Sequence, residues 1–126
     1  MNHQQLKLTT FEKTRDMLDF SDFLKVDMRV GTVIEAKPFP EARKPAFQIW
    51  IDFGEEIGIL KTSAQLTVRY TIVDLVGMQL IAVVNFPPKQ IGSFMSECLV
   101  LGAVGEDGDV VLMRPAGAAG NGQRIG

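Results

Sequence analysis

The residues that decide the fold are 85–103, NFPPKQIGSFMSECLVLGA, where one apolar strand ends and another begins. The run before them, residues 80–84 (LIAVV), is continuously apolar, as is typical of a strand buried on both faces. Pro87 and Pro88 have no amide hydrogen to donate to a strand ladder, so they end the strand and stiffen the loop after it. Alternation over residues 94–101 then predicts a second strand. We expect the connection to form a rigid, ligand-facing edge.

The N-terminal half carries the first strand of the predicted sheet. Alternation over residues 25–37 predicts a long, half-buried strand, and Ser21 is expected to cap a short helical turn before it. Gly31 falls on the outer face, where a glycine favours a bulge or a sharp coil. The residues expected on the inner face are Val26, Met28, Val30, Thr32, Ile34 and Ala36.

A proline-rich connection leads to the second strand. Residues 37–45 contain three prolines and are expected to form a rigid, exposed loop. Alternation over residues 47–53 predicts a strand with Trp50 on its outer face. Two explanations for Trp50 remain open: a neighbouring loop or the N-terminal arm covers it, or it contacts a subunit or ligand. The residues expected on the inner face are Phe47, Ile49, Ile51 and Phe53.

Short strands and turns complete the pattern. Residues 57–64 predict a third strand after a hairpin turn, residues 65–76 a short helix or an irregular crossover, and residues 110–113 a sixth strand. Five or six short strands with a crossover between the third and fourth are typical of an OB-type barrel. We therefore predict an all-β fold: an OB-fold five-stranded barrel with a short helical crossover and N- and C-terminal extensions.

Composition limits the domain count and the class of partner. A chain of 126 residues that is 46% hydrophobic can bury one core, so we expect residues 21–126 to form one domain behind an N-terminal arm, residues 1–20. The arm is either a disordered tail or a segment that packs on a partner subunit. A net charge of −2 and a pI near 5.3 argue against binding nucleic acid by bulk charge, but they allow a local basic patch.

The histidine and cysteine content of the chain limits the catalytic and metal-binding chemistry that it can carry out, and the cysteine also bears on its cellular location. Its one histidine, His3, lies in the arm, so we expect no catalytic triad, no metal site, no cofactor and no enzyme activity. No glycine pattern predicts a nucleotide-binding loop. The single Cys98, in an apolar segment, predicts a reduced thiol in or near the core. We expect a cytoplasmic protein without membrane insertion.

Several separated motifs carry a family resemblance. The segments FLKVDMRVGTVIEA, PEAR, IDFG and NFPPKQIGSFMSECLVLGA occur in that order. They resemble the tRNA-binding domain family, which includes the C-terminal domain of bacterial methionyl-tRNA synthetases. TSAQ at residues 62–65 and NFPP at residues 85–88 are similar to CsaA-type secretion chaperones of that family. The family signature falls on Asp27, Arg29, Val30, Gly31, Asn85, Gly92 and Ser96.

The resemblance implies a homodimer of OB barrels that binds unfolded or secretory preprotein chains, cooperates with the secretion machinery and has a tRNA-binding face. Two functional hypotheses follow. The first is an ATP-independent chaperone whose apolar groove has a polar rim, as suits promiscuous chain binding. Its candidate residues are Phe39, Phe47, Trp50 and Phe86 in the groove, with Arg43, Lys44 and Lys89 on the rim. For these aromatic residues, and for Phe47 above all, an ordinary place in the core is the alternative.

The second hypothesis is a tRNA-binding protein without a chaperone role, whose side chains mainly contact the sugar-phosphate backbone of the RNA. Its candidate residues are Lys61, Ser63, Asn85, Lys89 and Ser96.

Overall fold

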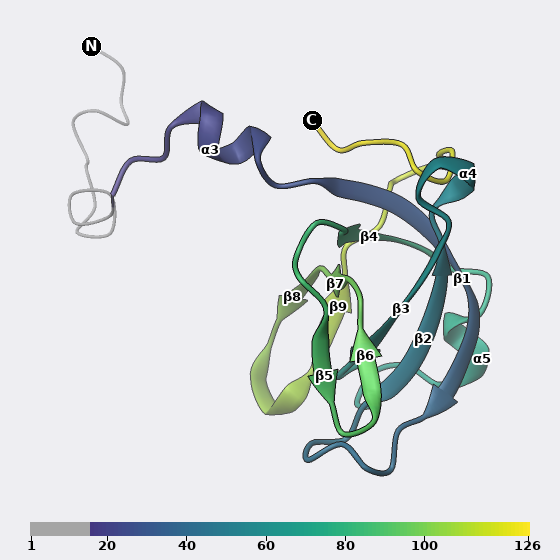
Figure 1. Ribbon diagram of the computed structural model, residues 1–126. Coiled ribbons are helices and arrows are strands. Elements are labelled where there is room, and N and C mark those ends of the chain that lie inside the picture. The colour runs from purple at the N-terminus through teal and green to yellow at the C-terminus, as the bar shows by residue number, and fades with distance from the viewer. Residues whose placement is uncertain (1–15) are drawn as a thin grey trace.

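The central element is a five-stranded antiparallel sheet that curls toward a barrel (Figure 1). The structure is a computed structural model that describes residues 16–126. The strand order is β3-β2-β1-β4-β7. The strands of this sheet are β1 (Met28–Pro38), β2 (Phe47–Asp52), β3 (Ile59–Ala64), β4 (Gln79–Val83) and β7 (Leu99–Val100). The all-β prediction is confirmed.

Two small hairpins and three short helices complete the described fold. Hairpin β5–β6 joins Lys89–Ile91 to Phe94–Ser96, and hairpin β8–β9 joins Gly102–Val104 to Val110–Leu112 across a 3-10 turn, η1 (Glu106–Gly108). The helices are α3 (Phe20–Leu24), α4 (Gly54–Ile57) and α5 (Ile72–Leu75). Figure 1 shows α3 standing apart from the sheet. The predicted arm, residues 1–20, lies mostly outside the described residues.

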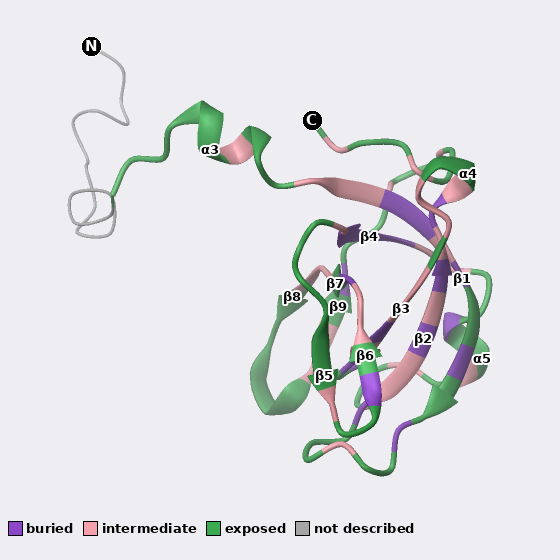
Figure 2. Ribbon diagram, viewed as in Figure 1, coloured by how far each residue is buried: buried purple, intermediate pink, exposed green. Residues whose placement is uncertain are grey.

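The core fills the inside of the curled sheet, and Figure 2 shows that the buried residues recur along its strands. Strand β2 supplies Ile49 and Ile51, and Phe53 follows it; all three are fully buried, as their alternation predicted. Phe47, expected to point inward with them, is half-buried and packs against the same core. Large apolar side chains on one face of β2 therefore hold the sheet together by removing apolar area from water.

Helix α5 lies in the crossover between β3 and β4, so the predicted short helix is confirmed. The amide of Asp74 donates to the Thr71 hydroxyl (3.2 Å) and the amide of Thr71 donates to the Asp74 carboxylate (2.9 Å), which forms a capping box. These hydrogen bonds hold the pKa of Asp74 below its usual value. The cap lets a four-residue helix exist in a β-branched segment and place Leu75 in the core. Helix α3 differs, because Asp19 rather than the predicted Ser21 is its N-cap residue.

Strand β1 reverses the predicted faces because it contains a bulge. Val33 pairs with Ile51 and Glu35 with Trp50, which leaves Ile34 as an extra residue between them. Val33, predicted outward, is 1% exposed, and Ile34, predicted inward, is 45% exposed. A period of two holds only along an unbroken ladder, so the extra residue moved every earlier side chain to the opposite face. The prediction for residues 28–34 was therefore wrong.

Gly31 lies on the inner face, ahead of the bulge rather than at it. A Cβ added there would lie 2.5 Å from Ile51 Cγ2 and 2.7 Å from the Phe53 ring. Val30, the outer position beside it, is nevertheless buried, and its backbone pairs with the C-terminal segment: the amide of Gly122 donates to the Val30 carbonyl (2.7 Å), and the Val30 amide donates to Gln123 O (3.0 Å). The C-terminal segment thus pairs with the edge of β1 at the place where the pairing with β2 has ended.

Further contacts fasten this C-terminal segment. Gln79 makes two hydrogen bonds to the backbone of Ala119. Its Nε2 donates to the Ala119 carbonyl (2.6 Å), and its Oε1 accepts from the Ala119 amide (3.1 Å). Arg29 donates to Gly122 O (2.9 Å) and to Asp27 Oδ1 (2.6 Å), and this side-chain hydrogen bond holds the pKa of Asp27 below its usual value. Arg29, Asp27 and the segment therefore form one connected polar cluster.

The predicted strand over residues 94–101 is broken in two. Glu97 turns toward β3, where its amide donates to Lys61 O (2.8 Å) and its Oε1 accepts from the Lys61 amide (3.0 Å). This side-chain contact replaces a rung of the ladder, so pairing stops after β6 and restarts at β7. The predicted sixth strand is confirmed as β9.

We predict that Gly31→Ala destabilises the fold by about 1–3 kcal/mol, because the added methyl group would overlap two fully buried side chains. Urea unfolding measures this change. Gly117→Ala is the matched control, since a Cβ there has nothing within 4 Å. Equal midpoints for the two variants would contradict the close packing described for β1.

Candidate functional site

Hairpin β5–β6 is fixed to the barrel by three aromatic rings. The ring centroid of Phe94, in β6, lies 5.4 Å from that of Phe39 and 6.1 Å from that of Trp50, the latter edge-on. Phe39 comes from the loop between β1 and β2, residues 39–46, and is 3% exposed. Its loop folds back and turns the ring inward, which is the core position given above as the alternative for these aromatic residues, although Phe39 also lines one of the pockets described below. Trp50 is half-buried, so a neighbouring segment covers it in part, which was one of the two explanations left open.

A directed chain of hydrogen bonds joins the same hairpin to β3. The single hydroxyl hydrogen of Thr62 reaches Cys98 O (2.7 Å), so the contact of 2.6 Å with Ser96 requires the Ser96 hydroxyl to donate. Ser96 Oγ in turn accepts from the amide of Ser63 (3.3 Å). Thr62 is fully buried, and an unpaired hydroxyl there would carry a desolvation cost. The hairpin is therefore held in one position relative to β3.

A polar pocket of about 530 Å³ lies between the loop 39–46 and this hairpin. The residues that give it its charge and polarity are Arg43, Lys44, Lys89, Glu41, Ser63 and Gln90. The three cations take part in none of the ion pairs formed within residues 16–126. Lys61 adds a fourth positive charge nearby, with its Nζ 5.2 Å from the centroid of the Phe94 ring. Positive charge without a carboxylate partner is thus gathered on one face of an acidic chain.

An apolar pocket of about 370 Å³ lies on a second side of the hairpin. It is lined by Phe86, Pro87, Lys89, Ser96, Cys98 and Leu99. Phe86 is 53% exposed and Leu99 50% exposed, so their apolar surfaces face solvent. Cys98 is buried, as predicted, and burial raises the pKa of its thiol to about 12. Lys89 lines both this pocket and the polar one.

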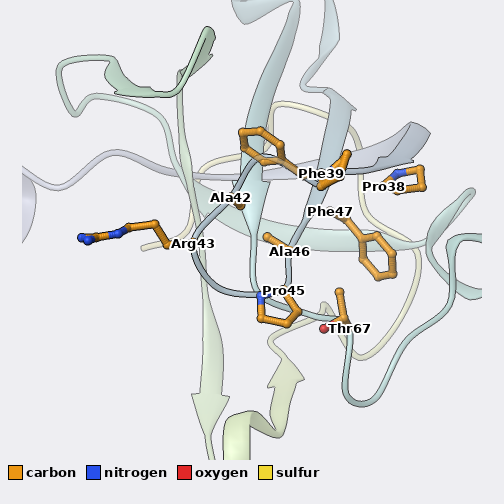
Figure 3. Close-up of a pocket in the computed structure, with 9 residues that line it drawn as sticks. Pro38, Phe39, Ala42, Arg43, Pro45, Ala46, Phe47 and Thr67 are labelled. Atoms are coloured by element: carbon orange, nitrogen blue, oxygen red, sulfur yellow. The ribbon is translucent and has the colours of Figure 1, made fainter.

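A third pocket, of about 380 Å³, lies against the loop between β1 and β2 (Figure 3). We call it the proline pocket, because Pro38, Pro40 and Pro45 line it together with Phe47 and Thr67. Arg43 lines both the proline pocket and the polar pocket, and in Figure 3 its side chain extends away from the other lining residues.

The structure distributes the predicted site residues over these features. Ser63, Lys89, Arg43 and Lys44 meet in the polar pocket. Phe86 and Ser96 line the apolar pocket, and Phe39 and Phe47 line the proline pocket. The predicted aromatic groove of four rings is therefore not formed as one surface.

Asn85 serves the fold. Its Oδ1 accepts from the Asp27 amide (3.0 Å) and its Nδ2 donates to Lys25 O (2.7 Å), which ties the end of β4 to the start of β1. The side chain replaces a ladder at the point where both strands stop. Asn85 is not among the residues that line the three pockets described above.

Sequence reasoning missed the hairpin β5–β6 and the pocket residues Glu41, Gln90 and Leu99. One signal for the hairpin was present. Gly92 and Ser93 form the two-residue loop between the paired residues Ile91 and Phe94, and Gly92 has a φ of 61°. Such loops require a positive φ, for which glycine is the favoured residue.

Two kinds of structural feature are absent from the described part of the chain. Within residues 16–126, no group of three or more His, Cys, Asp or Glu side chains could hold a metal ion. No helix in the same residues is long and apolar enough to cross a membrane.

Comparison with known proteins identifies the family of the chain. The family model described as "Putative tRNA binding domain" matches residues 28–124. The methionine–tRNA ligase of Bacteroides fragilis is 34% identical over 101 residues, which are 80% of this chain and 14% of that protein. The chain thus matches only a small part of the length of this relative. It belongs to the tRNA binding domain family.

Solved structures narrow the type within this family. The chaperone CsaA of Bacillus anthracis is 53% identical with a TM-score of 0.84, over 88% of this chain and all of that one. CsaA from Picrophilus torridus is 45% identical with a TM-score of 0.81, over 87% and 100%. A protein of Pyrococcus horikoshii related to methionyl-tRNA synthetase is 26% identical with a TM-score of 0.77, over 88% and 99%. The predicted OB fold and the resemblance to CsaA-type proteins are confirmed.

We predict that Asn85→Ala lowers the free energy of unfolding by ~1 kcal/mol or more, because the Asp27 amide and the Lys25 carbonyl lose their partner. Thermal melts would measure the loss. Gln90→Ala is the control, since its side chain bonds only within its own hairpin, to Gly92 O (3.0 Å). A wild-type melt for Asn85→Ala would show that the amide does not secure the two strands.

Proposed function

We propose that this protein binds RNA, with tRNA as the substrate class, through the polar pocket, and that it acts by binding rather than catalysis. The observation that carries the proposal is that Arg43, Lys44 and Lys89 converge there without carboxylate partners within the described residues. A cation already paired with a carboxylate must give up that partner to bind phosphate. An unpaired one releases only counterions, and this release drives nucleic-acid binding.

The position of the pocket supports the same proposal. It lies between the β1–β2 loop and the β5–β6 hairpin, beside the end of β3. OB folds bind oligonucleotides over their second and third strands, between the loops that flank them. Ser63 and Gln90 add polar groups between the cations, as suits contacts with sugar and phosphate oxygens. The relatives named as methionine–tRNA ligases act on tRNA, which further favours this class of ligand.

Removal of one cation provides the test. We predict that Lys89→Ala weakens tRNA binding and lowers the slope of log affinity against log salt by about one unit, because one phosphate contact is lost. Filter binding or anisotropy across a salt series measures both quantities. Lys25→Ala is the charge-matched control, since that lysine is paired with Asp22 beside α3. An unchanged slope for Lys89→Ala would overturn the polar pocket as the RNA site.

We propose polypeptide binding as a second activity, at the apolar pocket. Phe86 and Leu99 present exposed apolar surface there, beside a lysine and a serine hydroxyl. Unfolded or secretory preprotein chains expose the apolar side chains that such a pocket accepts. The similar solved structures are described as chaperones, which supports this reading. Cooperation with the secretion machinery stays a prediction.

The expected result is that the protein suppresses aggregation of a denatured test protein without ATP, and that Phe86→Ser reduces this effect by removing the apolar contact. Light scattering during refolding measures it. Val73→Ser is the matched control, because Val73 is highly exposed and lies outside the pocket. Equal loss in both variants would indicate nonspecific apolar capture and would contradict the assignment of this pocket.

A homodimer is proposed from the exposed apolar side chains around α3. Leu18, Phe20 and Leu24 are exposed there, and the Phe20 and Phe23 rings stack with centroids 6.0 Å apart. A cluster of this kind is typical of a surface that packs against a second copy. Multi-angle light scattering at micromolar concentration tests the proposal, and a monomer mass would refute it.

A further inference from the structure

We propose that the proline pocket holds the base of an unpaired nucleotide whose phosphate lies in the polar pocket. The inference rests on the proposed RNA binding and adds a subsite to it. It specifies that a single-stranded segment of the RNA is bound, since a base inside a duplex cannot leave its stack without cost.

The proline pocket is rigid before any ligand binds. Three prolines fix the backbone around it, and the loop is closed by two hydrogen bonds, from Phe39 N to Ala46 O (3.2 Å) and from Ala42 N to Phe39 O (3.2 Å). Its volume, about 380 Å³, falls within the range of roughly 300–1,000 Å³ that is usual for small-molecule sites. Little ordering is therefore needed when a ligand enters, which reduces the entropic cost of binding.

The lining chemistry fits a flat, weakly polar ring. The ring of Phe47 is half-buried, so part of it is available for contact. Thr67 supplies the only hydroxyl group among the described residues of the lining, and it can hydrogen-bond to the edge of a base. No carboxylate belongs to this lining set, so an attached phosphate meets no negative charge there.

Arg43 connects this apolar site to the cationic one. Because it lines both pockets, a ligand that spans them has an anionic group on one side of the arginine and an apolar ring on the other. A nucleotide has both groups, a short distance apart. Arg43 can contact its phosphate with several donors at once.

The face where OB folds usually stack bases is already filled by the protein itself. Phe94 and Phe39 are buried. Trp50 is met edge-on by Phe94, and Lys37 Nζ lies 5.1 Å from the centroid of its ring. A base that binds here must therefore find its stacking surface elsewhere, and Phe47 supplies one next to the cations.

Two fluorescent RNA chains of about 12 nucleotides test the proposal, one of polyuridine and one with the same backbone but no bases. Both carry the same charge, so they differ only in the presence of bases. We expect the wild-type protein to bind the base-bearing chain roughly tenfold more tightly, as measured by anisotropy. This comparison needs no mutation. Equal affinities would overturn the inference.

A second experiment fills the proline pocket with a larger side chain. Thr67→Trp should abolish the preference for bases, whereas Val68→Trp, at an exposed neighbour outside the lining, should retain it. Thermal melts check folding, and Thr67→Leu replaces the tryptophan variant if that one unfolds. A preference that survives both Thr67 variants would place the base elsewhere and overturn the inference.

The proposed function is tested separately in the same assay. If Lys44→Ala weakens binding of the two chains equally, the phosphate site stands whatever the result at Thr67. If Lys44→Ala changes neither affinity, the RNA-binding proposal fails instead. Loss of denatured-protein binding in Thr67→Trp, with unchanged RNA binding, would assign the proline pocket to a polypeptide side chain and overturn the inference.

Discussion

The packing of Phe94 against Phe39 and Trp50 is the interaction on which the arrangement of the three pockets depends. It joins three segments that are separate in the sequence: the loop after β1, strand β2 and hairpin β5–β6. The directed hydrogen bonds from Ser63 through Ser96 and Thr62 then fix the same hairpin to β3. Because apolar and polar contacts agree on one position, the pockets on both sides of the hairpin have defined walls.

The parts of the fold that sequence predicted correctly are those with unbroken periodicity. Strand β2 alternates without interruption, and its inner residues Ile49 and Ile51 are completely buried. Strand β1 has an equally clean pattern, yet the extra residue at Ile34 inverted the predicted faces before it. A bulge changes the register without changing the composition, so hydrophobic periodicity alone cannot locate it. Only the partner strand shows which residue is left unpaired.

The candidate site was predictable in its charges but not in its aromatic residues. Arg43, Lys44 and Lys89 were chosen as rim residues, and they do line one pocket. Phe39 was assigned to one groove with three other aromatic residues, but its ring packs inward against Phe94, and of the other three only Phe47 lines the same pocket. Whether a loop aromatic faces solvent depends on contacts distant in sequence. The net charge of −2 is similarly uninformative, since carboxylates elsewhere pair with Lys25, Arg29 and Arg69 and, within residues 16–126, leave the cations of this pocket unpaired.

The pairing of the C-terminal segment with β1 has a consequence for how the chain folds. Arg29 and Gly122, which are hydrogen-bonded, are 93 residues apart, and Thr32 reaches Asn121 across 89 residues. Contacts between residues so far apart in the sequence form late in folding, because closing the long loop costs entropy before the contacts can stabilise the fold. During synthesis, the edge of β1 that lies beyond β2, at Met28–Val30, stays unpaired until residues 119–125 have left the ribosome. The nascent barrel is therefore most prone to mispairing with other chains at that stage.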